Sequence, residues 1–398
     1  MISPFTLGSI AGFGTVVALA ARRGGRPFAS FVGVIFGIHT LISCAVARHV
    51  PWWAMPAFAY GQAAIYLHAA TLARSRMPST AWRALVAWPG SAFGAGTFLA
   101  LPWAVAGAFT SVTSSVWVPY ALAMLGVIES FSHRMTDVHV TLDDAHVEGL
   151  SRVAHGSERV EAPLRVVQIT DPHLGSFMSE GALRALCERA VAQSPDLVLL
   201  TGDLLTIESH HAGDSLASAL APLRALEGRT FACMGNHDHE VPHTIAKALA
   251  EAGVKLLIDD MATVTLPQGE VEVLGYDFRW RDRERHLAEV SARFPRTRGV
   301  LRLGLLHDPG AFAHLPPGAA DLVLSGHTHG GQVGLLRLGL PHTFVSAVSS
   351  VPDHGFWGLG TMRLYVHRGT GHYGFPVRVG VPVEESVLHV HVPRRSEP

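Results

Sequence analysis

Histidine, aspartate and asparagine residues follow a series of short apolar segments in the second half of this 398-residue chain. The clearest group is Ser325-Gly326-His327-Thr328-His329-Gly330-Gly331-Gln332, which comes directly after the apolar run 321–324. Two imidazoles one residue apart, on a turn that leaves a strand, can reach two neighbouring metal ions. Alone, this pair is weak evidence for a metal site.

Four earlier apolar segments end in the same way. Their polar residues are Asp171 and His173, then Gly202 and Asp203, then Gly235, Asn236, His237 and Asp238, and finally His307. Loops at the strand ends of α/β folds converge while the sheet holds them in place. Carboxylate, amide and imidazole ligands without thiolates suit Mn, Fe or Zn ions and argue against a structural zinc finger. The sequence therefore predicts a divalent metal centre.

In this order, the motifs D-x-H, G-D, G-N-H-D, a single His and G-H-x-H resemble those of the calcineurin-like metallophosphoesterase superfamily. The resemblance extends over about residues 160–392. The segments 365–371 and 376–378 resemble in particular a bacterial subfamily of membrane-tethered phosphodiesterases, which is similar to proteins described as transmembrane proteins with a metallophosphoesterase domain. One motif would be a weak match, but five in order are highly specific.

The resemblance implies two divalent metal ions and names their ligands. One ion would be held by Asp171, His173, Asp203 and His329, and the other by Asp203, Asn236, His307 and His327. Asp203 would bridge the ions, since two cations about 3.5–4 Å apart need an anion between them. A water activated by the metals would attack phosphorus in line, and the catalytic residue His237 would donate to the leaving-group oxygen or stabilise the transition state.

One departure from the family pattern concerns the protein Ser/Thr phosphatases. In those enzymes the Gly-Asp motif continues to a second Asp and an Arg, whereas Thr206 and Ile207 stand at these places here. A phosphoprotein-phosphatase role is therefore disfavoured, and another residue must orient His237.

The N-terminal third is apolar and carries few charges. Five membrane spans of about 20 residues are predicted, because the hydrocarbon core is about 30 Å thick. They cover 4–21, 28–47, 51–72, 84–108 and 113–132. Arginines cluster after the first and third spans, at Arg22, Arg23, Arg26, Arg74, Arg76 and Arg83. This asymmetry predicts a multi-pass protein of the cytoplasmic membrane with a cytoplasmic catalytic domain. If 84–132 forms one span, the domain lies on the other side.

Three parts are expected along the chain: a transmembrane helical region over 1–135, a connector over 136–163 with an edge strand at 138–142, and a catalytic domain over 164–398. In the last part, short apolar runs alternate with helical periodicity, which predicts an α/β fold with two β layers flanked by helices. The predicted strands are 164–170, 196–201, 229–234, 271–275, 300–306, 321–325, 332–338, 362–367 and 386–392, and the predicted helices are 180–193, 213–226, 243–252 and 282–292.

These features predict a membrane-anchored phosphoesterase that cleaves a phosphodiester or pyrophosphate bond. The resemblance implies a lipid-linked substrate such as UDP-2,3-diacylglucosamine; a soluble nucleotide-type substrate and a non-catalytic membrane sensor are the alternatives.

Two apolar loops, 174–178 and 333–351, adjoin the expected site, and they either pack in the core or form a rim that admits acyl chains. The bilayer is the expected partner, whereas neither nucleic acid nor an obligate protein partner is expected.

Overall fold

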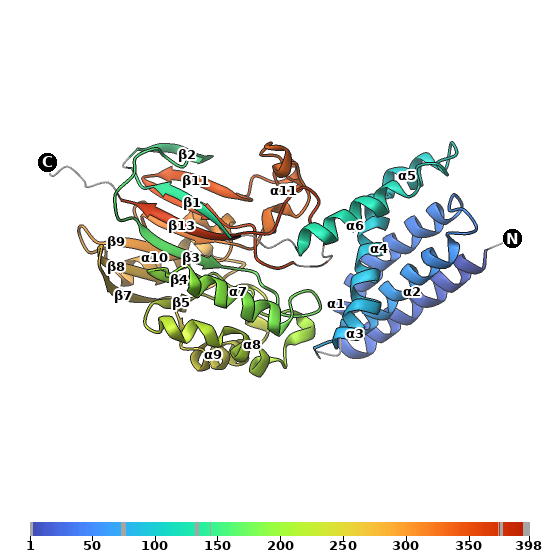
Figure 1. Ribbon diagram of the computed structural model, residues 1–398, viewed down its shortest axis with the longest axis horizontal. Helices are drawn as coiled ribbons and strands as arrows, with labels where there is room; N and C mark the ends of the chain where they lie inside the picture. The colour runs from blue at the N-terminus through green and yellow to red at the C-terminus, as the bar shows by residue number, and fades with distance from the viewer. Residues whose placement is uncertain are drawn as a thin grey trace.

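The computed structural model describes residues 3–72, 77–131, 135–143, 145–372, 374 and 377–392. A group of helices at the N-terminus lies beside a C-terminal domain of two β-sheets and flanking helices (Figure 1). The helical region ends with α6 (Val118–Ser130), and the sheet domain begins with β1 (Met135–Thr141).

The helical region begins with α1 (Pro4–Ala47), which is broken near its middle. Gly25 has a φ of 74° and Pro27 follows it, so the backbone turns where one residue tolerates positive φ and the other lacks an N–H. The two halves, Pro4–Arg22 and Gly25–Ala47, are long and apolar enough to cross a membrane. The remaining helical elements are α2 (Met55–Leu72), α3 (Thr80–Trp82), the π-helical turn Arg83–Ala87, α4 (Trp88–Leu99), α5 (Leu101–Ala106) and α6.

Among the described helices, two have the length and composition of a membrane span, where five were predicted. The predicted span 84–108 is divided at Ala100 between α4 and α5, and α6 has only 13 residues. Apolar composition did not reveal these breaks, although Pro89, Pro102 and Pro119 each stand in the first turn of a helix, where proline is favoured. Arg74 and Arg76, on which the predicted orientation depends, lie outside the described residues.

The C-terminal domain consists of two sheets packed face to face. The strand orders are β1-β13-β3-β4-β5-β6 and β2-β11-β12-β10-β9-β8-β7. Apolar side chains from both sheets, among them Val166, Phe231 and Leu324, fill the space between them. The strands after β1 are β2 (Val147–Arg152), β3 (Leu164–Ile169), β4 (Leu197–Leu200), β5 (Thr230–Ala232), β6 (Lys255–Leu256), β7 (Asp260–Leu266), β8 (Gly269–Gly275), β9 (Leu301–Leu305), β10 (Leu322–Ser325), β11 (Gly355–Gly360), β12 (Met362–Val366) and β13 (Glu385–His391).

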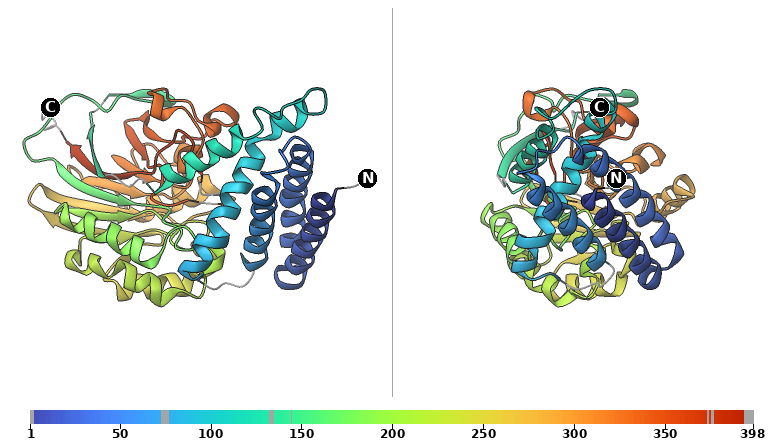
Figure 2. Two further views of the ribbon diagram at one scale, coloured as in Figure 1. Left: turned by 45° about the vertical axis from the view of Figure 1, so that its right-hand side comes forward. Right: turned by 90° about the vertical axis from the view of Figure 1, so that its right-hand side faces the viewer.

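Helices cover the outer face of each sheet (Figure 2). The first sheet packs against α7 (Glu180–Ala192), α8 (Gly213–Leu220) and α9 (Pro242–Glu251), and the second packs against α10 (Arg283–Arg293). The predicted α/β arrangement of two β layers flanked by helices is thus confirmed for this part of the chain.

The strands that lead into the predicted ligand loops are parallel. β3, β4 and β5 run in one direction within the first sheet, as do β9, β10 and β12 within the second. Their largely apolar sequences are typical of strands buried on both faces. The loop after β3 reaches the helical region, because the Trp88 indole Nε1 donates to the carbonyl oxygen of Ser176 over 3.1 Å. Loop 174–178 is otherwise packed in the core, with Leu174 and Met178 buried.

Residues 136–163, predicted as a connector with one edge strand, contribute two strands to the sheets. β1 pairs in parallel with β13 from Met135 to Thr141, and β2 pairs antiparallel with β11. Each sheet therefore gains an edge strand from this segment. The edge strand expected at 138–142 corresponds to β1, whereas β2 escaped prediction because its sequence, Val-Glu-Gly-Leu-Ser-Arg, has little apolar periodicity.

The strand predicted at 332–338 is wrong. Val333 and Gly334 form only isolated bridges, and Leu336–Leu338 is a turn of 3-10 helix. Gln332 and Gly339 both have positive φ, which interrupts extended backbone on each side. The predicted helix 213–226 also ends early as an α-helix, at Leu220, and continues as a 3-10 helix, Ala221–Leu226.

Candidate metal centre

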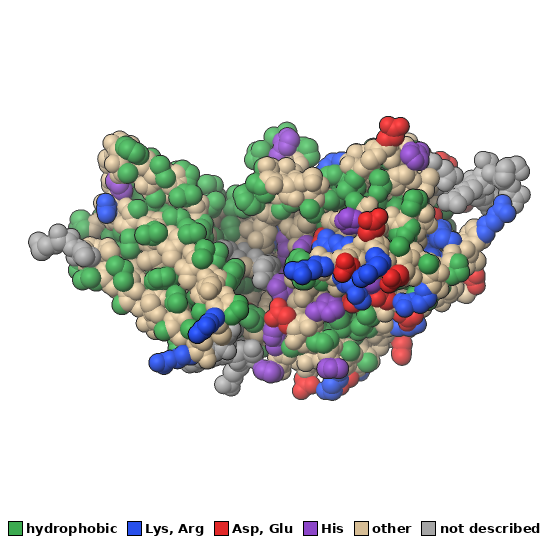
Figure 3. All heavy atoms as spheres, turned by 180° about the vertical axis from the view of Figure 1, so that it is seen from behind, with side chains coloured by type: hydrophobic (Ala, Val, Ile, Leu, Met, Phe, Trp, Pro, Cys, Tyr) green, Lys and Arg blue, Asp and Glu red, His purple; other side chains and the backbone are tan. Residues whose placement is uncertain are grey.

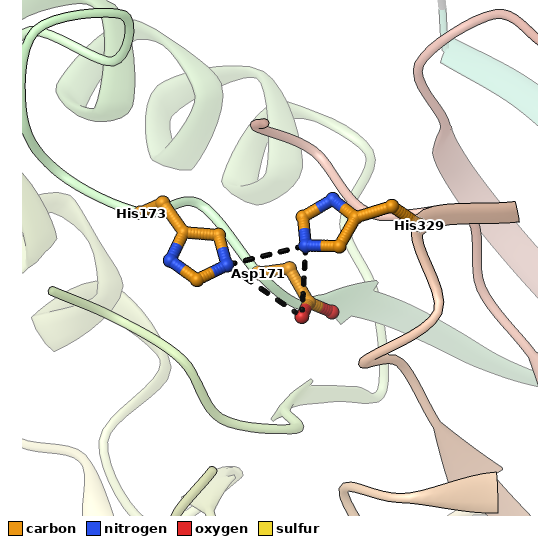
Figure 4. A group of neighbouring side chains, drawn as sticks. All are labelled: Asp171, His173 and His329. Atoms are coloured by element: carbon orange, nitrogen blue, oxygen red, sulfur yellow. Dashed lines mark hydrogen bonds and ion pairs between the residues drawn. The ribbon is translucent and has the colours of Figure 1, made fainter. Parts of the chain in front are cut away.

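Loops at the ends of β3, β4, β5, β9 and β10 meet on one side of the domain and form two groups of metal-ligating side chains. The first group consists of Asp171, His173 and His329 (Figure 4). Nε2 of His329 lies 3.2 Å from Nε2 of His173 and 3.4 Å from Oδ1 of Asp171, and all three residues are buried.

The second group consists of Asp203, His307 and His327. Nε2 of His307 lies 3.3 Å from Oδ2 of Asp203 and 3.2 Å from Nδ1 of His327. Oδ1 of Asn236 is also 3.3 Å from Nε2 of His307, so the amide joins this group. All the predicted ligands are therefore brought together.

Asp203 lies between the two groups. Its Oδ2 atom is 3.3 Å from His307 in the second group and 3.7 Å from Nε2 of His173 in the first. Burial opposes ionisation of this carboxyl, but the charge of His307 and the hydrogen bond from it outweigh burial and lower the pKa of Asp203. The carboxylate is thus ionised and central.

The spacing of the donor atoms fits divalent cations. Ligand atoms about 2.1 Å from one ion, at tetrahedral or octahedral angles, lie about 3.0–3.5 Å apart. Burial lowers the pKa of His173 to about 3 and that of His327 to about 4. Their rings are therefore neutral, and a neutral imidazole can offer a nitrogen lone pair to a metal ion.

His307 is oriented for the same role. Its Nδ1 donates to the carbonyl oxygen of Thr201 over 2.7 Å, so Nε2 faces Asp203 and Asn236. Burial lowers the pKa of His307, but the Asp203 carboxylate outweighs burial and raises it to about 10. A cation bound between these groups would take the place of the proton, as metal ligands require. The residues present thus fit two divalent metal ions.

The backbone of the ligand loops is unusual. Asp171, His173, Asp203, His327 and His329 all have φ between 46° and 68°, a region that residues other than glycine adopt rarely. Such conformations gather at functional sites, where the surrounding structure holds them in place. This strain distinguishes these five ligands from most of the other histidines and aspartates of the described chain.

Two glycines and one buried aspartate bring the loops close together. A Cβ atom would lie 2.1 Å from Oδ2 of Asp171 at Gly326, and 2.2 Å from Oδ1 of Asp203 at Gly235. The Asp238 carboxylate accepts hydrogen bonds from the backbone N–H groups of Gly235, Asp203 and Leu204, over 2.8–2.9 Å. Asp238 thus braces the loops after β4 and β5.

His237, the predicted proton donor, lies beside both groups. Its backbone N–H donates to Oδ1 of Asp203 over 2.9 Å, and its ring centroid is 5.6 Å from that of His173. The ring Nδ1 donates to Oε1 of Glu240 over 3.1 Å. Burial lowers the pKa of His237, but the Glu240 hydrogen bond and the charge of Asp203 outweigh it and raise the pKa.

Glu240 thus orients His237, a role that Thr206 and Ile207 do not fill. Thr206 instead forms hydrogen bonds with Ser209 within its own turn. Sequence reasoning missed Glu240, because its only signal was its position three residues after His237.

Arg378 was also missed as a site residue. Its buried guanidinium donates to the carbonyl oxygens of His329, Arg368 and Gly371, over 3.2, 2.8 and 2.7 Å. Its backbone N–H donates to the carbonyl oxygen of Gly126 on α6 over 3.4 Å. Arg378 therefore connects the helical region to a metal-ligand loop.

Residues 164–331 match the sequence model of the family described as calcineurin-like phosphoesterase. Phosphodiesterase YaeI of Escherichia coli (strain K12) is 29% identical, over 53% of this chain and 76% of that protein. A transmembrane protein with metallophosphoesterase domain of Danio rerio is 28% identical, over 69% of this chain and 61% of that protein. The UDP-2,3-diacylglucosamine pyrophosphatase LpxG of Chlamydia muridarum is 24% identical, over 52% of this chain and 78% of that protein.

The matched family region contains every residue of both ligand groups, from Asp171 to His329. The strand ends that carry these residues belong to an α/β domain with two β layers. The C-terminal part of this chain is therefore a calcineurin-like metallophosphoesterase domain, a metal-dependent phosphoesterase.

Proposed function

We propose that this protein is a membrane-anchored phosphoesterase that uses two divalent metal ions to hydrolyse a phosphodiester or pyrophosphate bond. The observation that carries this proposal is the position of Asp203. Its carboxylate lies between two groups of side chains that are either neutral or hold a proton that a metal ion can replace. An anionic bridge is what two neighbouring cations require, and two-ion sites are suited to in-line displacement at phosphorus.

The proposed ligands are Asp171, His173, Asp203 and His329 for one ion, and Asp203, Asn236, His307 and His327 for the other. When bound, such ions lower the pKa of water and stabilise negative charge that develops on phosphoryl oxygens. His237, with its pKa raised by Glu240, would hold a proton and donate it to the leaving-group oxygen. Asp238 and Arg378 would keep the ligand loops in position.

The proposed substrate is a lipid-linked phosphate. The name of the Chlamydia relative, which specifies a diacylated sugar nucleotide, supports this choice. Attachment to a membrane is supported by the candidate spans Pro4–Arg22 and Gly25–Ala47. We also propose a multi-pass helical region with a cytoplasmic catalytic domain: Arg22, Arg23 and Arg26 place the turn between the two candidate spans in the cytoplasm, and an odd number of spans in all returns the chain to that side.

The decisive experiment measures turnover of bis(p-nitrophenyl) phosphate by the full-length protein in detergent, loaded with Mn. Asp203→Ala should lose bound metal and nearly all turnover. A wild-type protein that binds two metal ions but cleaves neither diesters nor pyrophosphates would instead favour a membrane sensor.

The substrate class needs a separate comparison. Values of kcat/KM are measured for a diacylated sugar nucleotide and for the same sugar nucleotide without acyl chains. Equal values for the two compounds would remove the support for a lipid-linked substrate and favour a soluble nucleotide-type one.

A further inference from the structure

Residues 333–348, which we name the apolar lobe, begin directly after the metal-ligand motif. The lobe exposes large hydrophobic side chains, with Leu338 at 74%, Val348 at 67% and Phe344 at 61% of their full accessible surface. The other exposed members are Val333, Leu335 and Leu340. Arg337 is the only Asp, Glu, Lys or Arg residue in the lobe.

The lobe is held in a defined conformation by hydrogen bonds. Thr343 and Ser346 cap α11 (Phe344–Val348) reciprocally, and the Thr343 hydroxyl donates to the buried carboxylate of Asp353. Backbone N–H groups of Phe344 and Leu335 donate across the lobe to the carbonyl oxygens of Val333 and His342, each over 2.8 Å. The backbone polar groups are thus used internally while apolar side chains face outward. A contiguous exposed apolar surface of this kind marks an interaction site.

The lobe is joined to the helical region. The Glu129 carboxylate near the end of α6 pairs with Nε of Arg337 over 3.2 Å and accepts from the backbone N–H of Gly380 over 3.2 Å. Val377 packs in one cluster with Ala123 and Val127 of α6. The Glu129 carboxylate at the end of the helical region thus contacts the catalytic domain.

On its outer face, α6 exposes Leu122, Leu125 and Ile128. The lobe and α6 are therefore neighbours, and both expose apolar side chains. Figure 3 shows the lobe projecting at the upper edge, next to the largely hydrophobic helical region. In the same view, charged and histidine side chains gather elsewhere on the domain.

We propose that the apolar lobe inserts into the leaflet of the bilayer that holds the helical region and contacts lipid acyl chains there. This inference rests on the proposed membrane attachment. Apolar side chains at an interface are buried about 5–10 Å into the boundary between headgroups and acyl chains. Arg337, whose side chain is 62% exposed, can extend its charged end toward the headgroups.

Insertion of the lobe would determine where the metal centre lies relative to the bilayer. The lobe begins four residues after His329 in the sequence, and the bridge between Gly334 and Thr343 keeps it compact. Insertion of the lobe would hold the metal centre at the depth of lipid headgroups. A phosphate ester attached to a membrane lipid would then reach the metals without leaving the bilayer.

The test uses full-length protein in phosphatidylcholine vesicles, with a fluorophore on one introduced cysteine. Cys44→Ala provides the background, because Cys187 and Cys233 are buried. Labels are placed at Leu338→Cys and Phe344→Cys in the lobe, at Ile10→Cys in the first candidate span, and at Ile258→Cys, an exposed apolar position between β6 and β7. Replacing part of the lipid with acyl-spin-labelled lipid should reduce the fluorescence at 338, 344 and 10, and leave that at 258 unchanged.

The labels distinguish insertion of the lobe from membrane attachment of the helical region. Quenching at Ile10→Cys without quenching at 338 and 344 overturns the lobe inference but leaves membrane attachment intact. No quenching at any position overturns both the attachment and the lobe inference. Turnover of bis(p-nitrophenyl) phosphate by the unlabelled wild-type protein is measured in parallel, so a failure of the proposed chemistry is seen independently of quenching.

Discussion

At the scale of single residues, the metal centre depends on specific contacts between side chains. Asp203 reaches both ligand groups, and His237 depends on Glu240 for its orientation and its raised pKa. The ligand types and their order could be predicted from sequence because each follows an apolar strand. Glu240 could not, because a glutamate on a turn after His237 looks like any solvated carboxylate until the fold directs it at Nδ1.

Glu240→Gln should change the pH dependence of turnover. Only protonated His237 can donate a proton, so activity should fall as pH rises through its pKa. Removing the carboxylate that raises this pKa should move the alkaline limb of the kcat profile to lower pH, by about one unit or less because Glu240 is partly exposed. Glu251→Gln, an exposed glutamate on α9, serves as the control. An unmoved limb in Glu240→Gln would show that Glu240 does not tune His237.

Gly235→Ala should disable the metal centre, since the added Cβ would lie 2.2 Å from the Asp203 carboxylate. The carboxylate must shift, so both ligand groups lose their shared member. Mn content per chain and diester turnover should both fall strongly. The matched control is Gly181→Ala in the first turn of α7, where a Cβ meets nothing within 4 Å. Full metal content in Gly235→Ala would contradict the bridging position of Asp203.

At the scale of elements, sequence predicted the strands that are buried on both faces and missed several at the edges. β3, β4, β9 and β10 are short and largely apolar, which is typical of central parallel strands. β2 and β7 are edge strands with mixed composition, so their pairing is decided by neighbours distant in sequence. Segment 332–338 failed in the opposite direction, because its apolar side chains are exposed in the lobe rather than buried in a strand.

Arg378→Met should weaken metal binding although Arg378 is not a ligand. The guanidinium holds the backbone of His329, Arg368 and Gly371, and methionine fills similar volume without donating. Loss of a partner that orients a ligand typically weakens metal affinity by about 10–100-fold, which titration with Mn can measure directly. Arg285→Met, at an exposed position on α10, should leave the affinity unchanged. An unaltered affinity in Arg378→Met would sink the positioning role.

At the scale of the whole molecule, composition divided the chain into an apolar and a soluble part. It placed the end of the apolar part at residue 135, where β1 begins, but put the start of the catalytic domain at residue 164. The apolar part was predicted as five spans, but proline positions and helix lengths leave two described helices that meet the requirements of a span. The polar composition of 136–163 suggested a connector, yet both of its strands belong to the sheets. Hydropathy reports how apolar a segment is. An edge strand can bury apolar side chains on one face only, so its composition is mixed and resembles that of a loop.

Two truncated chains test where the catalytic domain begins. Residues 135–398 keep β1 and β2, whereas residues 164–398, the domain predicted from sequence, lose both. Without β1, the sheet loses its pairing with β13 and the buried side chain of Val140. Without β2, β11 becomes an unpaired edge, and such edges promote aggregation.

The shorter chain should therefore be less stable. Lost strand pairing and lost apolar burial together are expected to cost more than about 3 kcal/mol, which lowers Tm by roughly 6–12 °C in a domain of this size. Thermal unfolding by circular dichroism, with size-exclusion chromatography to detect aggregates, measures the difference. Both truncations lack the helical region, so its removal cancels in the comparison. Equal Tm values with both chains monomeric would show that β1 and β2 are dispensable and that the domain begins at residue 164.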